Sequence, residues 1–118
     1  KEAYKYNGKT KVNIYDEINA AMSQPRYKKN MYKTKKFVDG MIQSGSISST
    51  VRICNTGLLI YINYHNIREL IKSVYDKCIE HQQPECQIYW NVFSQKFKNQ
   101  IKRVDVSRFG SLRIKNIK

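Results

Sequence analysis

The chain has 118 residues, of which 41% are hydrophobic and 12% aromatic, enough to build one packed domain and too apolar for general disorder. Its formal net charge is +13 at pH 7, and no apolar run reaches the ~20 residues that a membrane-spanning helix needs. The three cysteines include no C-x-x-C pair and no signal-peptide pattern is present, so we expect a reduced, intracellular protein that is not secreted.

The positive charge is concentrated at the two ends of the chain. Residues 1–40 carry ten Lys/Arg against four Asp/Glu, residues 41–90 carry four against four, and residues 91–118 carry eight against one. If folding places both basic ends on one face, that face can bind a polyanion through counterion release. If it does not, the ends are two solvated surfaces.

The first elements in chain order are an arm and a helix. Residues 1–12 are polar, basic and without a period, so we expect a basic flexible arm, followed by a single domain at residues 13–118. Asn13 is a suitable N-cap, Asp16 suits the first helical turn, and apolar residues then recur at helical spacing until Pro25.

A second helix and a hairpin are predicted next. The helix runs from about residue 29 to residue 43, with Gly45 as its C-terminal stop. Residues 50–63 are rich in β-branched and apolar residues and are interrupted near Gly57, which predicts a β-hairpin.

The third helix has the strongest apolar period in the chain. Asn66 is its expected N-cap and Glu69 completes a capping box. We expect near-complete burial of Leu70, Ile71, Val74 and Cys78. A fourth helix is predicted at about residues 85–103, and alternating apolar and basic residues predict a strand at 111–117.

This order of elements, helix-helix-hairpin-helix-helix-strand, predicts a compact α+β domain with the last strand added to the hairpin. A hairpin among packed helices is also loosely similar to winged-helix domains. The stretch from the predicted hairpin into the third helix, TGLLIYINYHNIRELI at residues 56–71, resembles the KilA-N class of viral and phage DNA-binding domains. The resemblance covers a small part of the chain and assigns no role to any residue, but it implies a DNA partner.

The densest basic segment is RYKKNMYKTKK, residues 26–36, which contains no acid. Like charges at this density are costly unless a polyanion is bound, and Tyr27 and Tyr32 could bond phosphate or stack on bases. The alternative is a solvated helix face. We therefore predict phosphate contacts from Arg26, Lys28, Lys29, Lys33, Lys35 and Lys36.

A second basic set lies near the C-terminus and a smaller one at the hairpin tip. Cations close to a helix C-terminus also gain from the helix dipole, whatever their function. A hairpin tip could act as a wing, although most such turns are only turns. The predicted contacts here are Arg52, Asn55, Lys98, Lys102, Arg108, Arg113 and Lys115.

No catalytic pattern is present in the sequence. His65 and His81 flank the third helix without a close-spaced partner, and each suits a surface or capping role. The acidic pair Asp16 and Glu17 is explained by the first turn of its helix, and no other acids cluster. We therefore expect no catalytic residues, no metal site and no cofactor.

Two functions fit these observations. The first is a non-enzymatic nucleic-acid-binding domain, with DNA favoured over RNA, in which the two basic segments grip phosphates. The alternative is a protein interaction or assembly module, such as a viral structural or host-directed factor. Its expected surface anchors are the aromatic residues Tyr61, Tyr64, Tyr89 and Trp90. Formation of a homodimer is left open for either function.

Overall fold

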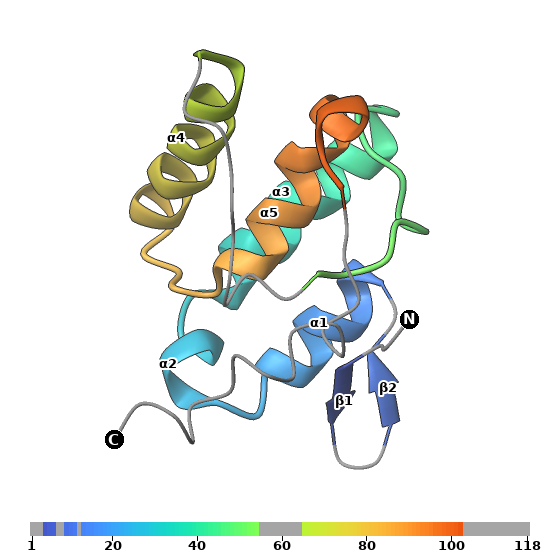
Figure 1. Cartoon of the computed structure of the whole chain (residues 1–118). Coiled ribbons are helices and arrows are strands. Elements are labelled where there is room, and N and C mark those ends of the chain that lie inside the picture. The colour runs from blue at the N-terminus through green and yellow to red at the C-terminus, as the bar shows by residue number, and fades with distance from the viewer. Residues whose placement is uncertain (1–3, 7–8, 12, 55–64, 103–118) are drawn as a thin grey trace, which may run out of the picture.

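Helices make up most of the chain where this computed structural model describes it, which is residues 4–6, 9–11, 13–54 and 65–102 (Figure 1). The helices are α1 (Ile14–Ala21), α2 (Pro25–Lys28), α3 (Met31–Gln43), α4 (His65–Glu80), α5 (Cys86–Ser94) and the 3-10 helix η1 (Gln95–Gln100). Two short strands, β1 (Tyr4–Tyr6) and β2 (Lys9–Lys11), pair antiparallel within the segment expected to be an arm.

The predicted α+β class is wrong, because the domain core in the described ranges is built by helices and by loops between them. Of the predicted hairpin, residues 50–54 are irregular chain, and residues 55–63 lie outside the described residues, as does the predicted strand at 111–117. Ile53, counted as a strand residue, is instead buried against the helices. Strand propensity depends on context, and the winged-helix comparison has no support from the described residues, because residues 50–54 form no strand.

The predicted start of the first helix is confirmed. The Asn13 side-chain oxygen accepts hydrogen bonds from the backbone N–H groups of Tyr15 and Asp16 at 3.0 and 3.1 Å. Asp16 in turn accepts from the Asn13 N–H at 3.0 Å, which completes a capping box. Pro25 lies after the end of α1 and begins α2, where its fixed φ and missing N–H suit the first helical position.

The end of the second predicted helix, α3, is also confirmed. Gly45 has φ of +77°, a conformation that glycine adopts without strain. Its N–H donates to the Ile42 carbonyl at 3.0 Å, and the Ser46 N–H donates to the Met41 carbonyl at 3.0 Å. This pair of bonds is a Schellman motif, which stops α3 at Gln43.

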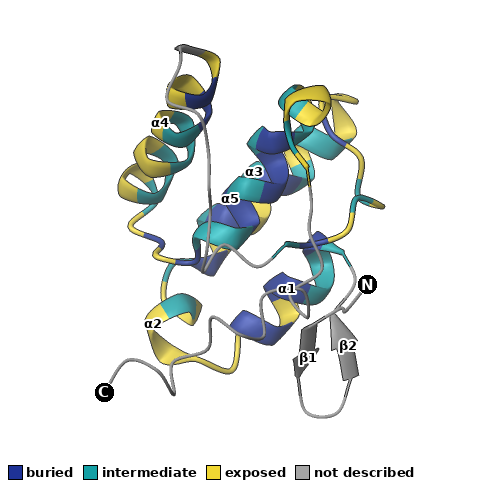
Figure 2. Cartoon of the chain, viewed as in Figure 1, coloured by how far each residue is buried: buried dark blue, intermediate teal, exposed yellow. Residues whose placement is uncertain are grey.

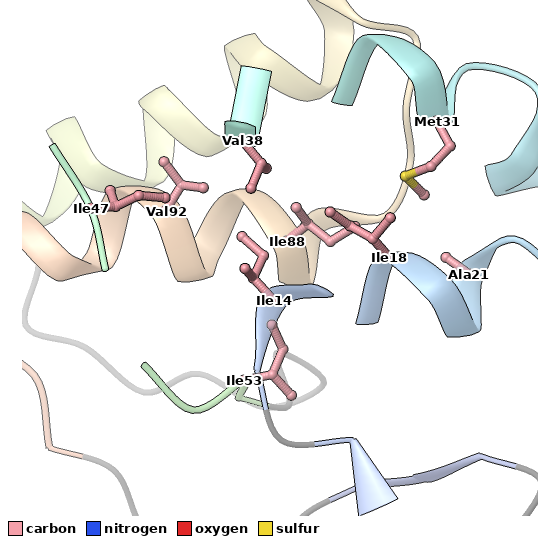
Figure 3. Packing of buried hydrophobic residues seen from close by; sticks show 9 residues of the cluster. All are labelled: Ile14, Ile18, Ala21, Met31, Val38, Ile47, Ile53, Ile88 and Val92. Atoms are coloured by element: carbon pink, nitrogen blue, oxygen red, sulfur yellow. The ribbon is translucent and has the colours of Figure 1, made fainter. Parts of the chain in front are cut away.

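The main core lies between α1, α3 and α5. Figure 3 shows apolar side chains from these three helices pointing toward one another, joined by two loop residues. The members of the cluster are Ile14, Ile18, Ala21, Met31, Val38, Ile47, Ile53, Ile88 and Val92. A buried hydrogen bond of 2.7 Å between Thr34 and Tyr89 also joins α3 to α5, so α3 is held with one face inward.

The predicted burial of the third helix, α4, is largely wrong. Leu70 is fully buried, but Ile71, Val74 and Cys78 are only half-buried. Two further members of the same apolar stripe, Tyr75 and Ile79, are 65% and 57% exposed, and Figure 2 shows that much of the outer side of α4 is open. The helix also begins at His65, so Asn66 lies inside it rather than capping it.

Candidate nucleic-acid interface

The six cations predicted between residues 26 and 36 meet at the corner where α2 turns into α3. Arg26 and Lys28 lie on α2, Lys29 lies in the two-residue connection, and the others lie in the first half of α3. All are exposed except Lys33, which is partly buried. We call residues 26–36 the basic corner.

The turn between α4 and α5 holds the basic corner in place. The Gln83 side-chain amide donates to the Tyr27 carbonyl of α2 at 2.8 Å, and its own oxygen accepts from the Glu85 N–H at 3.1 Å. The Asn30 amide, at the start of α3, donates to the Gln82 carbonyl at 3.0 Å. Gln83 is fully buried, so the backbone of the corner is fixed from inside while most of its cationic side chains are exposed.

Most cations of the basic corner have no acidic partner. Lys35 pairs with Asp39 at 3.0 Å, and Asp39 also accepts from the Tyr15 hydroxyl at 2.6 Å. The hydrogen bonds from Tyr15 and then Lys35 lower the pKa of Asp39, so it stays ionised. In the described part of the chain, no carboxylate forms an ion pair with Arg26, Lys28, Lys29, Lys33 or Lys36.

Two of these cations lie instead against aromatic rings. The Arg26 guanidinium is 4.5 Å from the centre of the Tyr27 ring, and it also donates to the Gln24 side chain at 3.3 Å. The Lys33 ammonium is 5.9 Å from the centre of the Tyr32 ring. Cation–π contacts of this kind leave the positive charge available to an anion, because the ring carries no net charge.

The lysines of α4 are arranged differently. Lys72 pairs with Asp76 at 2.6 Å, and Lys77 pairs with Glu80 at 3.0 Å. Lys77 also lies 4.9 Å from the centre of the Phe37 ring, so it supports packing between α4 and α3. Both lysines of the neutral middle therefore have a carboxylate partner on their own helix.

The C-terminal basic set is only partly described. Lys98 and Lys102 are exposed on and after η1, Arg52 is exposed in irregular chain, and the remaining predicted contacts lie outside the described residues: Asn55, Arg108, Arg113 and Lys115. Gln95 of η1 exchanges two hydrogen bonds with the Ser48 backbone, which places η1 beside the C-terminal end of α3. The basic corner begins at the other end of this helix, which is roughly 20 Å long at 1.5 Å per residue (Figure 1). The single continuous face stays a prediction.

The aromatic anchors of the alternative function are not where they were expected. Tyr89 is fully buried and cannot contact a partner, and Trp90 is half-buried. Tyr61 and Tyr64 lie outside the described residues. Among the described residues, the exposed large apolar side chains are Met22, Tyr32, Tyr75 and Ile79; the last two lie on α4, where sequence periodicity had placed them in the core.

His81 has a structural role. Its Nδ1 lies 2.9 Å from the Tyr89 hydroxyl, and the same hydroxyl bonds to Thr34, so one buried chain of polar groups joins α3, α5 and the turn before α5. Burial lowers the pKa of His81, which favours the neutral ring at neutral pH. The histidine therefore serves packing rather than the surface or cap predicted for it.

A buried pair of carboxyl groups lies behind the basic corner and was missed from the sequence. Glu17 of α1 and Glu85, the N-cap of α5, are 2% and 5% exposed, and their side chains interact. Gln87 binds both, since its amide donates to Glu17 and its backbone N–H donates to Glu85, each at 3.3 Å. Burial, followed by the contact with Glu17, raises the pKa of Glu85 to about 8, so the pair keeps a proton at neutral pH.

Features that would support catalysis are sparse where the structure is described. A half-open cleft of about 740 Å³ lies between the loop after α3, α4 and η1, and Glu69 is the sole carboxylate among its lining residues. Burial raises the pKa of Cys78 to about 11, which disfavours a reactive thiolate. Across the described ranges, no three His, Cys, Asp or Glu side chains gather as a metal site would need.

None of the described helices combines the length and the apolarity that crossing a bilayer demands, as the sequence predicted.

No protein-family model, curated protein or solved structure matches this chain. The likeness of residues 56–71 to the KilA-N class therefore gains no support from the rest of the chain. Function has to be argued from the basic corner itself.

Proposed function

We propose that this chain is a non-enzymatic nucleic-acid-binding domain, with DNA as the favoured partner, and that the basic corner contacts phosphates. One observation carries the proposal: five exposed or partly exposed cations of the corner lack a carboxylate partner, while the lysines of α4 have one each. The corner and α4 differ in whether their cations have carboxylate partners, and a generally high lysine content does not account for that difference.

The electrostatics of the corner favour an anionic ligand. Like charges within a few residues repel one another in the free protein, and a polyanion removes this repulsion while releasing its own counterions. Since Gln83 and Asn30 fix the backbone of the corner, little ordering is needed when the ligand binds. Tyr32 is 68% exposed, and its hydroxyl adds a neutral hydrogen-bond donor beside the cations.

The salt dependence of binding tests the proposal. Fluorescence anisotropy would follow the binding of labelled duplex DNA, single-stranded DNA and RNA between ~0.05 and ~0.3 M salt. We expect micromolar or tighter binding at ~0.1 M salt, and five duplex contacts predict a slope of log K against log salt of about −4 to −5. Absence of binding to all three ligands at micromolar protein would overturn the proposal.

Matched neutralising variants separate a defined site from net charge. Lys28→Gln/Lys29→Gln and Arg68→Gln/Lys72→Gln each remove two positive charges at exposed positions, the first pair from the corner and the second from α4. The corner pair is expected to flatten the duplex slope by about 1.8, from about 0.9 for each lost contact, and the α4 pair to leave it nearly unchanged. Equal changes would mean that binding follows net charge alone.

A second candidate function rests on α4. Tyr75 and Ile79 expose apolar surface on a helix whose two lysines are each paired with a carboxylate, and aromatic and aliphatic side chains of this kind anchor protein interfaces. The interaction module is therefore the alternative if nucleic acids do not bind.

A further inference from the structure

Helix α3 has two faces of opposite character. Met31, Thr34 and Val38 point inward and are fully buried. The residues on the opposite side are exposed and recur along the helix at Tyr32, Lys36, Gly40 and Gln43. At 100° per residue, these four fall within a sector of about 80°, so they form one continuous outer face.

Gly40, which lies at one edge of this outer face, has no structural explanation within the described protein. A Cβ built at this position meets no atom within 4 Å, and its φ is not positive. Glycine weakens a helix interior relative to alanine, and the protein gains neither a close contact nor a turn in return. The bare backbone does, however, let an outside molecule approach α3 closely.

The surface around Gly40 has the chemistry of a base-reading helix. It forms a shallow hollow of about 480 Å³ lined by Tyr32, Lys35, Lys36, Asp39, Gly40 and Gln43. The ion pair between Lys35 and Asp39 leaves Lys36 as the one unpaired charge among the lining residues, which suits contact with base edges, while the other unpaired cations lie toward the N-terminal end of α3, where phosphates would be met. Lysine and glutamine are the side chains that bind guanine and adenine edges in the major groove.

We propose that the outer face of α3 lies in the major groove of duplex DNA, with Gly40 against the groove, Lys36 and Gln43 at base edges, and the other cations of the basic corner on the backbone. The major groove is about 12 Å wide and admits one helix, and α3 is long enough to lie across it. The proposal rests on the nucleic-acid function proposed above and narrows it to double-stranded DNA.

Substitutions at Gly40 test whether α3 lies in the major groove, and they do so without disturbing the core. Gly40→Ala should raise the melting temperature, because alanine favours a helix and the site is open, and it should change the affinity for a mixed-sequence ~20-bp duplex less than threefold. Gly40→Leu should fold equally well by circular dichroism, yet bind the duplex at least tenfold more weakly. Asn19→Leu, which adds the same side chain at an exposed position of α1, serves as the control and should bind like the parent.

The outcomes separate this inference from the function on which it rests. If the parent binds duplex and the Lys28→Gln/Lys29→Gln variant flattens its salt slope, but Gly40→Leu binds as tightly as Asn19→Leu, then α3 is not in the groove and the phosphate site stands. Preference of the parent for the single strand over the duplex would also overturn the inference. Failure of the parent to bind any nucleic acid would overturn both proposals.

Discussion

Replacing Ile88 with alanine is expected to lower the free energy of unfolding by about 2 to 5 kcal/mol. Ile88 is fully buried on α5, at the centre of the cluster formed by α1, α3 and α5 (Figure 3). The change removes apolar contacts and leaves a cavity that the surrounding helices fill only in part. Such a loss is a large share of the total stability of a small domain, and equilibrium unfolding in urea would measure it.

Ile79 provides a matched control for this prediction. It is the same residue type on a neighbouring helix but is 57% exposed, so Ile79→Ala should change the free energy of unfolding by less than about 1 kcal/mol. Similar denaturation midpoints for the two variants would contradict both the position of the core and the exposure of α4.

The second large effect is expected from Glu85 and depends on pH. Because the pKa of Glu85 is raised from 4.5 to about 8, the folded protein keeps a proton that the unfolded chain loses above about pH 4.5. This group therefore lowers stability as the pH rises from 4.5 to 8, by at most about 1.4 kcal/mol per pH unit. Glu85→Gln removes the titration and keeps an oxygen that can accept from the Gln87 N–H.

Comparing the stability of the parent and the Glu85→Gln variant between pH 5 and pH 8.5 isolates the titration of Glu85 from that of other groups. The Glu85→Gln variant should be close to the parent in stability at pH 5 and more stable than it by a few kcal/mol at pH 8. Thermal or urea unfolding at a series of pH values would show the difference growing with pH. Parallel curves for parent and variant would contradict the buried carboxyl pair.

Local signals in the sequence were sufficient for the ends of two helices. The start of α1 depends on Asn13 and Asp16, three residues apart, and the end of α3 depends on the conformation of Gly45. Both are decided within one helical turn, which is why residue type alone predicts them. The sequence also predicts that the six cations of the basic corner cluster in space, because they lie within eleven consecutive residues.

Features that depend on distant pairs were not predictable. Asp39 is bonded to Tyr15 on another helix, and Glu85 meets Glu17 across the core, contacts that no local pattern encodes. Likewise, the apolar period of α4 shows which residues share a face but not how much of that face a neighbour covers. The exposure of Tyr75 is the consequence.

The strand prediction for residues 50–54 failed for a related reason. β-branched residues fit any half-buried surface, and Ile53 finds one among helices.

The most direct test of the central claim is to map which backbone amides respond to DNA. Nuclear magnetic resonance spectra of the uniformly ¹⁵N-labelled chain would be recorded during titration with a short duplex at ~0.1 M salt. We predict that the largest shift changes fall on α2 and α3, residues 25–43, and that α4 amides around Tyr75 and Ile79 change little. Changes centred on α4, or spread evenly over all exposed lysines, would contradict binding through the basic corner.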